Sequence, residues 1–340
     1  MSRAWELANS RVDSEEDVIN IDAKAGRKNY IINGNFDIWQ RGDSQTTNGY
    51  GSDDRWNNAH SGSTKVHEKV AFTLGQTDVP GEPKFFSRTT VTSVPGAGNL
   101  VYKHHSVESV RTLAGQVATL SFWAKADASK NIAVEFSQWF GSGGTPSATI
   151  TGIGVTTIPL TTSWQKFTVT VDIPSITGKT LGTDGNDRLL VAFWFDAGSN
   201  YDTRTNSLGQ QSGLFDIAQV QLEKGSQATD FEYRSYGEEL ALCQRYYQSL
   251  LNSGGVCYIP AVYRSTSASA FFIVPILTRM RSTPTVSGEF SYSVDGGGYT
   301  AFSPIVYVVS TLISLGTGIA HGNDSEITIA ASNIRLDAEL

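Results

Sequence analysis

Three tryptophans on polar strand faces are the first candidates for chemistry in this sequence. Trp139 and Trp194 fall on the opposite side of their predicted strands from the neighbouring Val and Phe residues. Trp123 shares a predicted face with Ser121 and Lys125. A flat ring on such a face can stack on a sugar, because the C–H bonds of a sugar are weakly positive against the π face. These positions therefore predict a glycan-stacking platform on one sheet of a β-rich fold.

Polar neighbours of these rings could read sugar hydroxyl groups, as the few polar groups of a ligand site usually do. The predicted glycan-binding set is Trp139, Trp194, Trp123, Glu135, Gln138 and Asp196. Glu135 and Asp196 are also the candidates for a glycosidase carboxylate pair, which must flank a glycosidic bond. Two alternatives stay open: the carboxylates solubilise a polar face, or the tryptophans are covered by a loop or a neighbouring subunit and belong to the core.

A calcium ion is a second candidate ligand. Asp37, in the phrase NGNFD, and Asp216, in LFDIAQVQLEKG, lie near the two ends of one long strand-rich block. The two ends must meet if that block closes into a sandwich. Calcium takes six to eight oxygens from carboxylates, carbonyls and water, so Asp37 and Asp216 with backbone carbonyls are the predicted metal ligands. An ordinary turn role for both residues is the alternative.

No motif for an enzyme is present: the sequence contains no nucleophile elbow, phosphate loop, dinucleotide fingerprint or HExxH motif. Its two cysteines, Cys243 and Cys257, fit neither a disulfide framework nor a zinc spacing. We therefore predict no catalytic residue and no cofactor other than a structural calcium ion.

The amino-acid composition excludes further classes of protein. The 340 residues carry a net charge of −7, and only 17% are charged whereas 11% are aromatic. A mildly acidic chain without basic clusters lacks the charge pattern of a nucleic-acid binder. No apolar stretch approaches a membrane helix, and the N-terminus lacks the apolar segment of a secretory signal. We expect a protein that is made in a cytoplasm, is not exported by an N-terminal signal and does not insert into membranes.

The pattern along the chain predicts an all-β protein in four parts. Residues 1–28 contain a short amphipathic helix, which needs a partner because so short a helix is unstable alone; a frayed terminus is the alternative. Residues 29–234 show period-2 alternation between turns and predict a jelly-roll sandwich without helices. Residues 235–253 predict one linking helix, because Ser235-Tyr236-Gly237-Glu238 matches a capping box. Residues 254–340 predict a small C-terminal β-sandwich, apolar enough to be buried partly between subunits.

Several longer phrases resemble a module common in fibre and receptor-binding proteins of tailed bacteriophages. NYIINGNFDIWQRG and GYGSDDRW resemble its opening, and QVQLEKGSQATDFEYRSYGEELALCQRYYQ resembles its close. RMRSTPTV and the final NIRLDAEL are similar to the C-terminal part of the same proteins. SRAWELAN resembles a phage-fibre start, although Trp5 stands where that family has a charged residue. The resemblance covers the start, middle and end of the chain, while the domain interiors match only by pattern.

The resemblance implies a virion structural protein: a homotrimeric fibre or spike, on the tail or the capsid, assembled in the host cytoplasm. Residues 1–28 would dock it to other virion proteins, and the jelly roll or the C-terminal tip would adhere to host-surface glycans. In similar carbohydrate-binding modules a calcium ion often joins the start and end of the fold, which supports Asp37 and Asp216 only loosely. Two alternatives remain, a purely architectural decoration or connector protein and a polysaccharide depolymerase. The missing β-helix repeat lowers the expectation of a depolymerase.

Overall fold

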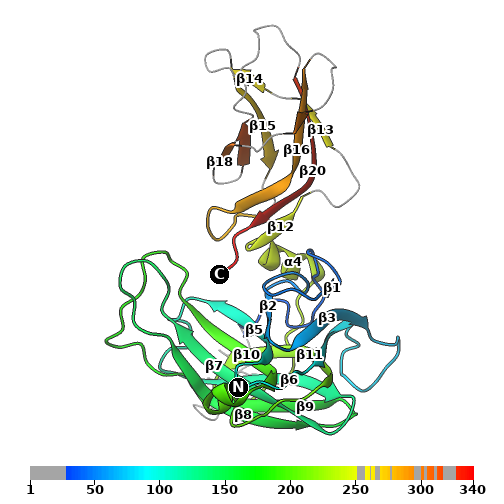
Figure 1. The fold of residues 1–340 in the computed structure, drawn as a ribbon, viewed down its shortest axis with the longest axis vertical. Helices are drawn as coiled ribbons and strands as arrows, with labels where there is room; N and C mark the ends of the chain where they lie inside the picture. Colours follow the sequence, from blue (N-terminus) through cyan, green and yellow to red (C-terminus); the bar gives the residue numbers. More distant parts are fainter. Residues whose placement is uncertain are drawn as a thin grey trace, which may run out of the picture.

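The computed structural model shows a β-sandwich followed by a C-terminal set of strands (Figure 1). The described residues are 28–250, 257–260, 262–264, 269–275, 278–294, 300–301, 305–309, 312–316 and 327–340. The predicted N-terminal helix falls on residues 1–27, outside the described residues. In the described part, no helix has the length and apolar character needed to cross a membrane.

Two antiparallel sheets form the sandwich, so the predicted all-β fold is confirmed. The first has the order β1 (Ser44–Gln45), β3 (Thr64–Ala71), β4 (Phe85–Thr92), β11 (Gly213–Lys224), β6 (Val117–Ala126) and β9 (Gln165–Asp172). The second has the order β2 (Trp56–Ser61), β5 (Leu100–Glu108), β10 (Arg188–Ala197), β7 (Lys130–Trp139) and β8 (Ile150–Leu160). Several neighbours, such as β4 with β11 and β5 with β10, are distant in sequence, as in a jelly roll.

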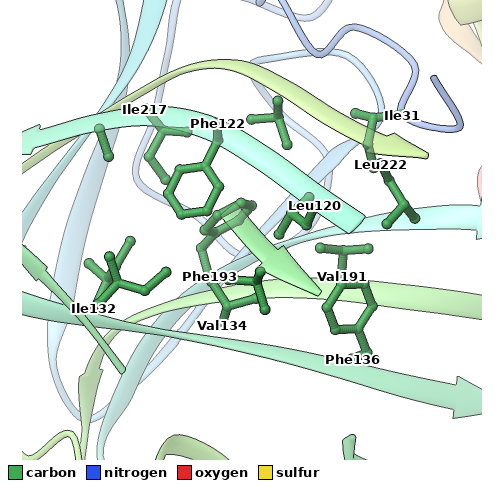
Figure 2. Packing of buried hydrophobic residues seen from close by; sticks show 14 of the residues in the cluster. Ile31, Leu120, Phe122, Ile132, Val134, Phe136, Val191, Phe193, Ile217 and Leu222 are labelled. Carbon is green, nitrogen blue, oxygen red and sulfur yellow. The ribbon is translucent and has the colours of Figure 1, made fainter. Parts of the chain in front are cut away.

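The core lies between the inner faces of these sheets (Figure 2). Phe122 of β6 meets Phe193 of β10 edge-on, with ring centroids 4.9 Å apart. Val191 and Phe193 are fully buried in the core cluster, whereas Trp194 belongs to a separate apolar cluster on the outer face. The period-2 alternation read from the sequence is therefore confirmed along β10.

The start and end of the block lie side by side, as predicted. Tyr30 donates its backbone N–H to the carbonyl of Leu222 at 2.9 Å, and Val220 donates to the carbonyl of Gly34 at 2.8 Å. Trp56 at the start of β2 is fully buried in the core. The two backbone hydrogen bonds join the first loop to β11 and close the sandwich.

The expectation that residues 29–234 contain no helix is wrong in one place. A single 3-10 turn, η1 (Ser199–Tyr201), runs into the four-residue helix α3 (Asp202–Thr205). The segment follows Gly198 and ends at Asn206, which adopts a left-handed conformation. It is too short to show a helical period in the sequence, and it covers part of the outer face of the five-stranded sheet.

The linking helix is shorter than predicted. α4 spans Tyr236–Gln244, and the Ser235 hydroxyl accepts the amide of Glu238 at 3.3 Å, as a capping residue should. The helix ends before Tyr247, which pairs with Asp337 in strand β12 (Tyr247–Ser249). The helix therefore does not reach the predicted end at residue 253, and Tyr247 belongs to a strand.

The C-terminal strands form two further sheets, which extend away from the sandwich beyond α4 (Figure 1). One contains β12, β20 (Ile327–Asp337), β16 (Thr285–Val294) and β17 (Thr300–Ala301), with β13 (Cys257–Pro260) also paired to β20. The other has the order β14 (Val262–Arg264), β15 (Ser269–Pro275), β19 (Leu312–Gly316) and β18 (Ile305–Val309). The described residues of this part are in strands and turns, as the sequence predicted.

Buried ion pairs fasten the end of the chain to the sandwich. Glu339 pairs with Arg55 and lies 3.2 Å from Arg41, and both arginine side chains are almost fully buried. The guanidinium of Arg55 also stacks on the ring of Tyr246 at 3.4 Å. Because unpaired buried charges are very costly, these contacts hold α4 and the last residues of the chain in one position against the sandwich.

Candidate functional site

Trp194 lies on the outer face of the five-stranded sheet, but it is fully buried. Tyr102 stacks on its ring at 4.7 Å, and Tyr201 of η1 packs against it at 5.4 Å. Its indole N–H donates to Glu135 at 3.0 Å. The prediction of an exposed stacking ring is therefore wrong for Trp194, because the unpredicted short helical segment covers it.

Glu135 is buried beside Trp194, and both of its carboxylate oxygens accept hydrogen bonds from protein groups. Arg204 of α3 donates to both carboxylate oxygens at 2.8 Å, and the backbone N–H of Gly152 donates at 2.7 Å. With the indole N–H, four hydrogen bonds reach one carboxylate. Such saturation leaves no acceptor for a ligand, so Glu135 fixes α3 on the sheet instead of presenting a polar group to solvent.

The other two polar residues of the predicted set are also buried in structural roles. Asp196 accepts from the hydroxyls of Ser63 at 2.6 Å and Ser93 at 2.8 Å, and from the amide of Gln211 at 2.7 Å. Gln138 donates to the carbonyl of Pro174 at 2.7 Å. Neither side chain is exposed, so the expectation that they line an accessible face with the tryptophans is wrong.

Trp123 belongs to the other sheet and lines an open pocket. The pocket holds about 290 Å³ and lies on the outer face of the six-stranded sheet, at β6, β9 and β11. Its walls combine three aromatic rings with hydroxyl, amide and charged groups. They are formed by Pro80, Ser121, Trp123, Lys166, Gln219, Asp230, Phe231 and Tyr233.

A β-bulge directs Gln219 into this pocket. The register between β11 and β6 shifts between Ala218 and Gln221, and Gln219 adopts a positive φ of 47°. Its amide donates to the carbonyl of Pro80 at 2.7 Å and to the hydroxyl of Tyr233. Tyr233 in turn donates to Pro80 at 2.7 Å, so three segments that are distant in sequence fix one wall of the pocket.

Tyr233 and Phe231 come from the segment that follows β11 and folds back over the sheet. Their rings meet edge-on with centroids 5.0 Å apart, and Tyr233 is 49% exposed. Glu223 holds this segment by accepting the amide and the hydroxyl of Thr229, each at 2.8 Å. Partial burial raises the pKa of Tyr233, which keeps its hydroxyl protonated as a donor to Pro80.

The ring of Trp123, unlike that of Trp194, is free of contacts with other rings and with cations among the described residues. Among the described residues it makes no hydrogen bond, no ring contact and no cation–π contact. It is half-buried, and its direct strand neighbours are Ala218 on one side and Lys166 on the other. Because Ala218 is small and Lys166 is exposed, a face of the indole remains open to the pocket.

Trp139 lies at the end of β7 on the five-stranded sheet, with Arg188 of β10 as its direct neighbour. The guanidinium carbon of Arg188 lies 3.8 Å from the centroid of the Trp139 ring. Trp139 and Arg188 are both half-buried. Trp139 and Trp194 therefore share one sheet, but Trp123 does not, and the six predicted residues do not form one platform.

The two aspartates predicted to bind calcium are engaged with protein groups. Asp216 makes a bidentate pair with Arg88, with both N–O distances 2.8 Å, and Lys125 lies 3.9 Å away. Asp37 accepts from Asn35 at 2.8 Å, and burial raises the pKa of its carboxyl. Two cations beside Asp216 disfavour a metal ion there. Among the described residues, no group of three His, Cys, Asp or Glu side chains could hold a metal. The aspartates therefore do not fit a calcium site.

Several residues of the pocket wall were missed from the sequence because they lie outside any regular alternation. Phe231 and Tyr233 follow β11 in a loop, and Gln219 points outward only because of the bulge. The one available signal was the aromatic spacing of the phrase DFEY next to the QVQLEKG strand. Ser121 and Trp123, in contrast, follow directly from alternation in β6.

The sandwich is similar to several solved structures, all with weak scores. The enzymatically active domain of tailspike protein 4 of bacteriophage CBA120 matches 58% of this chain at 12% identity, with a TM-score of 0.31. This chain spans only 21% of that tailspike chain. The family 11 carbohydrate-binding module of Clostridium thermocellum, solved with a mixed-linked tetrasaccharide, matches 55% of this chain and 98% of its own at 12% identity, with a TM-score of 0.33.

A third similar structure is a putative sugar binding protein of Bacteroides thetaiotaomicron. It matches 58% of this chain and 100% of its own length at 15% identity, with a TM-score of 0.33. No family model and no curated protein sequence matches this chain. At such low scores, nothing about the ligand of this chain follows from these similarities.

Proposed function

We propose that this chain is a non-enzymatic, trimeric fibre protein of a tailed-bacteriophage virion that binds host-surface glycans through the pocket around Trp123. The phage assignment is supported by the phrases that resemble fibre proteins at the start, middle and end of the chain. The glycan assignment is supported by the chemistry of the pocket. Residues 1–28 would dock the fibre to other virion proteins, on the tail or the capsid, after assembly in the host cytoplasm.

The observation that carries the glycan assignment is the open indole of Trp123 among fixed polar groups. Sugar rings present C–H groups that stack on an aromatic face, and hydroxyl groups that need several donors and acceptors. Lys166 and Asp230 are exposed at the rim of the pocket, while Gln219 is held in its wall. A volume of about 290 Å³ lies at the lower end of small-molecule sites. The pocket thus suits a single sugar unit of a longer chain.

Binding to an array of bacterial surface polysaccharides tests this assignment. Trp123→Ala and Tyr233→Ala should each lower binding about fivefold or more, because stacking on one aromatic ring contributes roughly 1 to 3 kcal/mol. Tyr236→Ala is the matched control for Tyr233→Ala, since Tyr236 is 59% exposed on α4 and does not line the pocket. Unchanged binding by both pocket variants, with intact folding, would overturn the assignment of the pocket.

The mass of the purified protein in solution tests the fibre assignment separately. Sedimentation or light scattering should give three times the 36.8 kDa of one chain. A stable monomer at micromolar concentration would contradict the trimer. Release of reducing ends from a bound polysaccharide would replace the non-enzymatic proposal with a depolymerase.

A further inference from the structure

A second feature on the opposite sheet suits an anionic ligand. Arg188 begins β10 on the five-stranded sheet, directly between Trp139 of β7 and Glu108 of β5. The indole lies against one side of the guanidinium at 3.8 Å. An arginine stacked on an aromatic ring keeps its N–H groups free at the edge of the plane.

Arg188 has no hydrogen bond and no ion pair with any described residue, and its Nε is buried without a partner. Glu108, the acid opposite it, is already engaged. Arg245 donates to both oxygens of Glu108 at 2.8 and 2.9 Å, and the Tyr246 hydroxyl donates to it at 2.7 Å. The guanidinium of Arg188 is therefore a half-buried charge that the described part of the chain leaves uncompensated.

Two further arginines act on Arg188. Burial lowers the pKa of Arg188, and the charges of Arg55 and Arg281 also lower it, while Tyr50 and Tyr102 oppose them. The charge of Arg188 also acts on His104. His104 itself carries no positive charge near neutral pH, because burial lowers its pKa to about 3. Holding a desolvated cation without an acid is costly, and an anion from outside the chain would compensate it.

Aromatic and hydroxyl groups complete this part of the face. Tyr102 stacks on His104 at 5.6 Å, and the Tyr50 hydroxyl lies 3.5 Å from the hydroxyl of Ser106. Aromatic rings and hydroxyl groups beside a guanidinium can contact the ring and hydroxyl groups of a sugar. The site therefore suits a carboxylate on a sugar better than a bare, multiply charged ion. Arg281, which donates to the carbonyl of Gly185 at 3.1 Å, borders the same end of the sandwich.

We propose that Arg188, positioned by Trp139, binds the carboxylate of an acidic sugar unit of the uronic-acid type. The choice of a saccharide rests on the proposed function. The site itself is separate from the pocket around Trp123, because the two lie on different sheets. One adhesin would then contact a charged polysaccharide at two places, a ring-stacking pocket and a carboxylate site.

Calorimetric titration of the intact protein tests the proposal, with oligogalacturonate and with the same oligosaccharide after methyl esterification. The parent should bind the acid form, and esterification should weaken binding about tenfold or more, because the ester removes the negative charge that strengthens hydrogen bonds from the guanidinium. Arg188→Gln should weaken binding of the acid form by a similar factor, and Arg188→Lys by less. Arg111→Gln is the matched control, because Arg111 is an exposed arginine, and it should bind as the parent does.

One further variant, one melting measurement and one competitor separate a carboxylate site from the pocket, from a structural arginine and from a bare anion site. Trp123→Ala should keep the difference between acid and ester, so failure of the pocket and failure of the carboxylate site are distinguishable. The melting temperature of Arg188→Gln should equal or exceed that of the parent, whereas a purely structural role predicts a decrease. The proposal is overturned if the parent does not bind oligogalacturonate, if acid and ester bind equally, or if Arg188→Gln binds as the parent does. Full competition by an equal concentration of inorganic phosphate would overturn it in favour of a bare anion site.

Discussion

Two tryptophan–arginine pairs lie at opposite ends of the same strand, β10, and they differ in one partner. At one end, Arg204 lies 4.9 Å from the ring of Trp194, and Glu135 neutralises it. At the other end, Arg188 lies 3.8 Å from the ring of Trp139 and forms no ion pair with a described residue, because Arg245 and Tyr246 engage Glu108 opposite it. Trp194 is fully buried, whereas Trp139 remains half-buried.

The difference shows that an aromatic ring beside a cation does not identify a binding site by itself. What matters is whether the protein completes the charge balance and covers the ring. The pair at Trp194 is complete, so it stabilises the position of α3. The pair at Trp139 has no ion pair with a described residue, and for that reason we propose it as a ligand site. Four experiments test this distinction, beginning with the largest expected effect.

Trp194→Ala should destabilise the fold by about 4 kcal/mol, because it leaves a cavity beneath α3 and removes the indole donor to Glu135. Trp139→Ala should lower the free energy of unfolding by only about 1 kcal/mol, since its ring is partly exposed. Chemical denaturation of both variants measures the difference. Equal losses would contradict the contrast between a closed and an open pair.

Arg204→Gln should lower the free energy of unfolding by about 3 kcal/mol, because the buried Glu135 would lose its ion partner. Denaturation with urea measures this loss. Arg204→Lys, which restores the charge without the bidentate geometry, should recover part of it. A loss below about 1 kcal/mol would show that Glu135 does not depend on Arg204.

His104 gives the arginine-rich end of the face a pH dependence. Its pKa is about 3 in the folded protein, because burial first and then the charges of Arg188 and Arg55 disfavour the imidazolium. The unfolded chain binds this proton near pH 6.5, so stability is lost as the pH falls from about 6.5 towards 3. His104→Gln should remove up to about 2 kcal/mol of that loss at pH 5.

The measurement for His104 is the free energy of unfolding of parent and His104→Gln at pH 7.5 and pH 5, at one ionic strength. The difference between the two proteins isolates His104 from the other buried histidines, such as His67 and His105. Parallel pH curves for the two proteins would contradict the lowered pKa.

Arg188→Gln should change stability least, leaving it unchanged or raising it by up to about 1 kcal/mol, because no ion pair with a described residue is broken. The same substitution at Arg204 is destabilising, so the two positions form a matched pair. Thermal melting of both variants side by side gives the answer. A loss at Arg188 as large as that at Arg204 would mean that Arg188 is structural.

The period-2 alternation of apolar residues predicted which side chains face the core, but not which segments cover the outer faces of the sheets. Val191 and Phe193 were placed in the core, and Trp194 on the opposite face, from period-2 spacing alone. The burial of Trp194 depends on the segment that ends in α3, a four-residue helix whose sequence carries no helical period. Glu135 was expected on a polar face for the same reason, because no local pattern shows that Arg204 returns to it from a distant loop.

The candidate pocket could be predicted only in part. Trp123 and Ser121 follow from the spacing of β6, and both line the pocket. Gln219 depends on a bulge that shifts the register by tertiary pairing, and Tyr233 depends on the path of a loop after β11. Such long-range contacts leave no periodic trace in one sequence. The sequence also carried no sign that Arg88 on β4 takes both oxygens of Asp216, one of the two predicted calcium ligands.

Fluorine NMR of protein labelled with 5-fluorotryptophan tests most directly whether the outer surface of the six-stranded sheet takes a sugar. Each resonance can be assigned by a Trp→Phe variant, and the protein is titrated with the polysaccharide that binds best on the array. We predict a saturable shift at Trp123, whose ring is open to the pocket, and none at Trp194, which is fully buried and donates to Glu135. A polysaccharide that binds the protein yet leaves the Trp123 resonance unmoved would contradict the account.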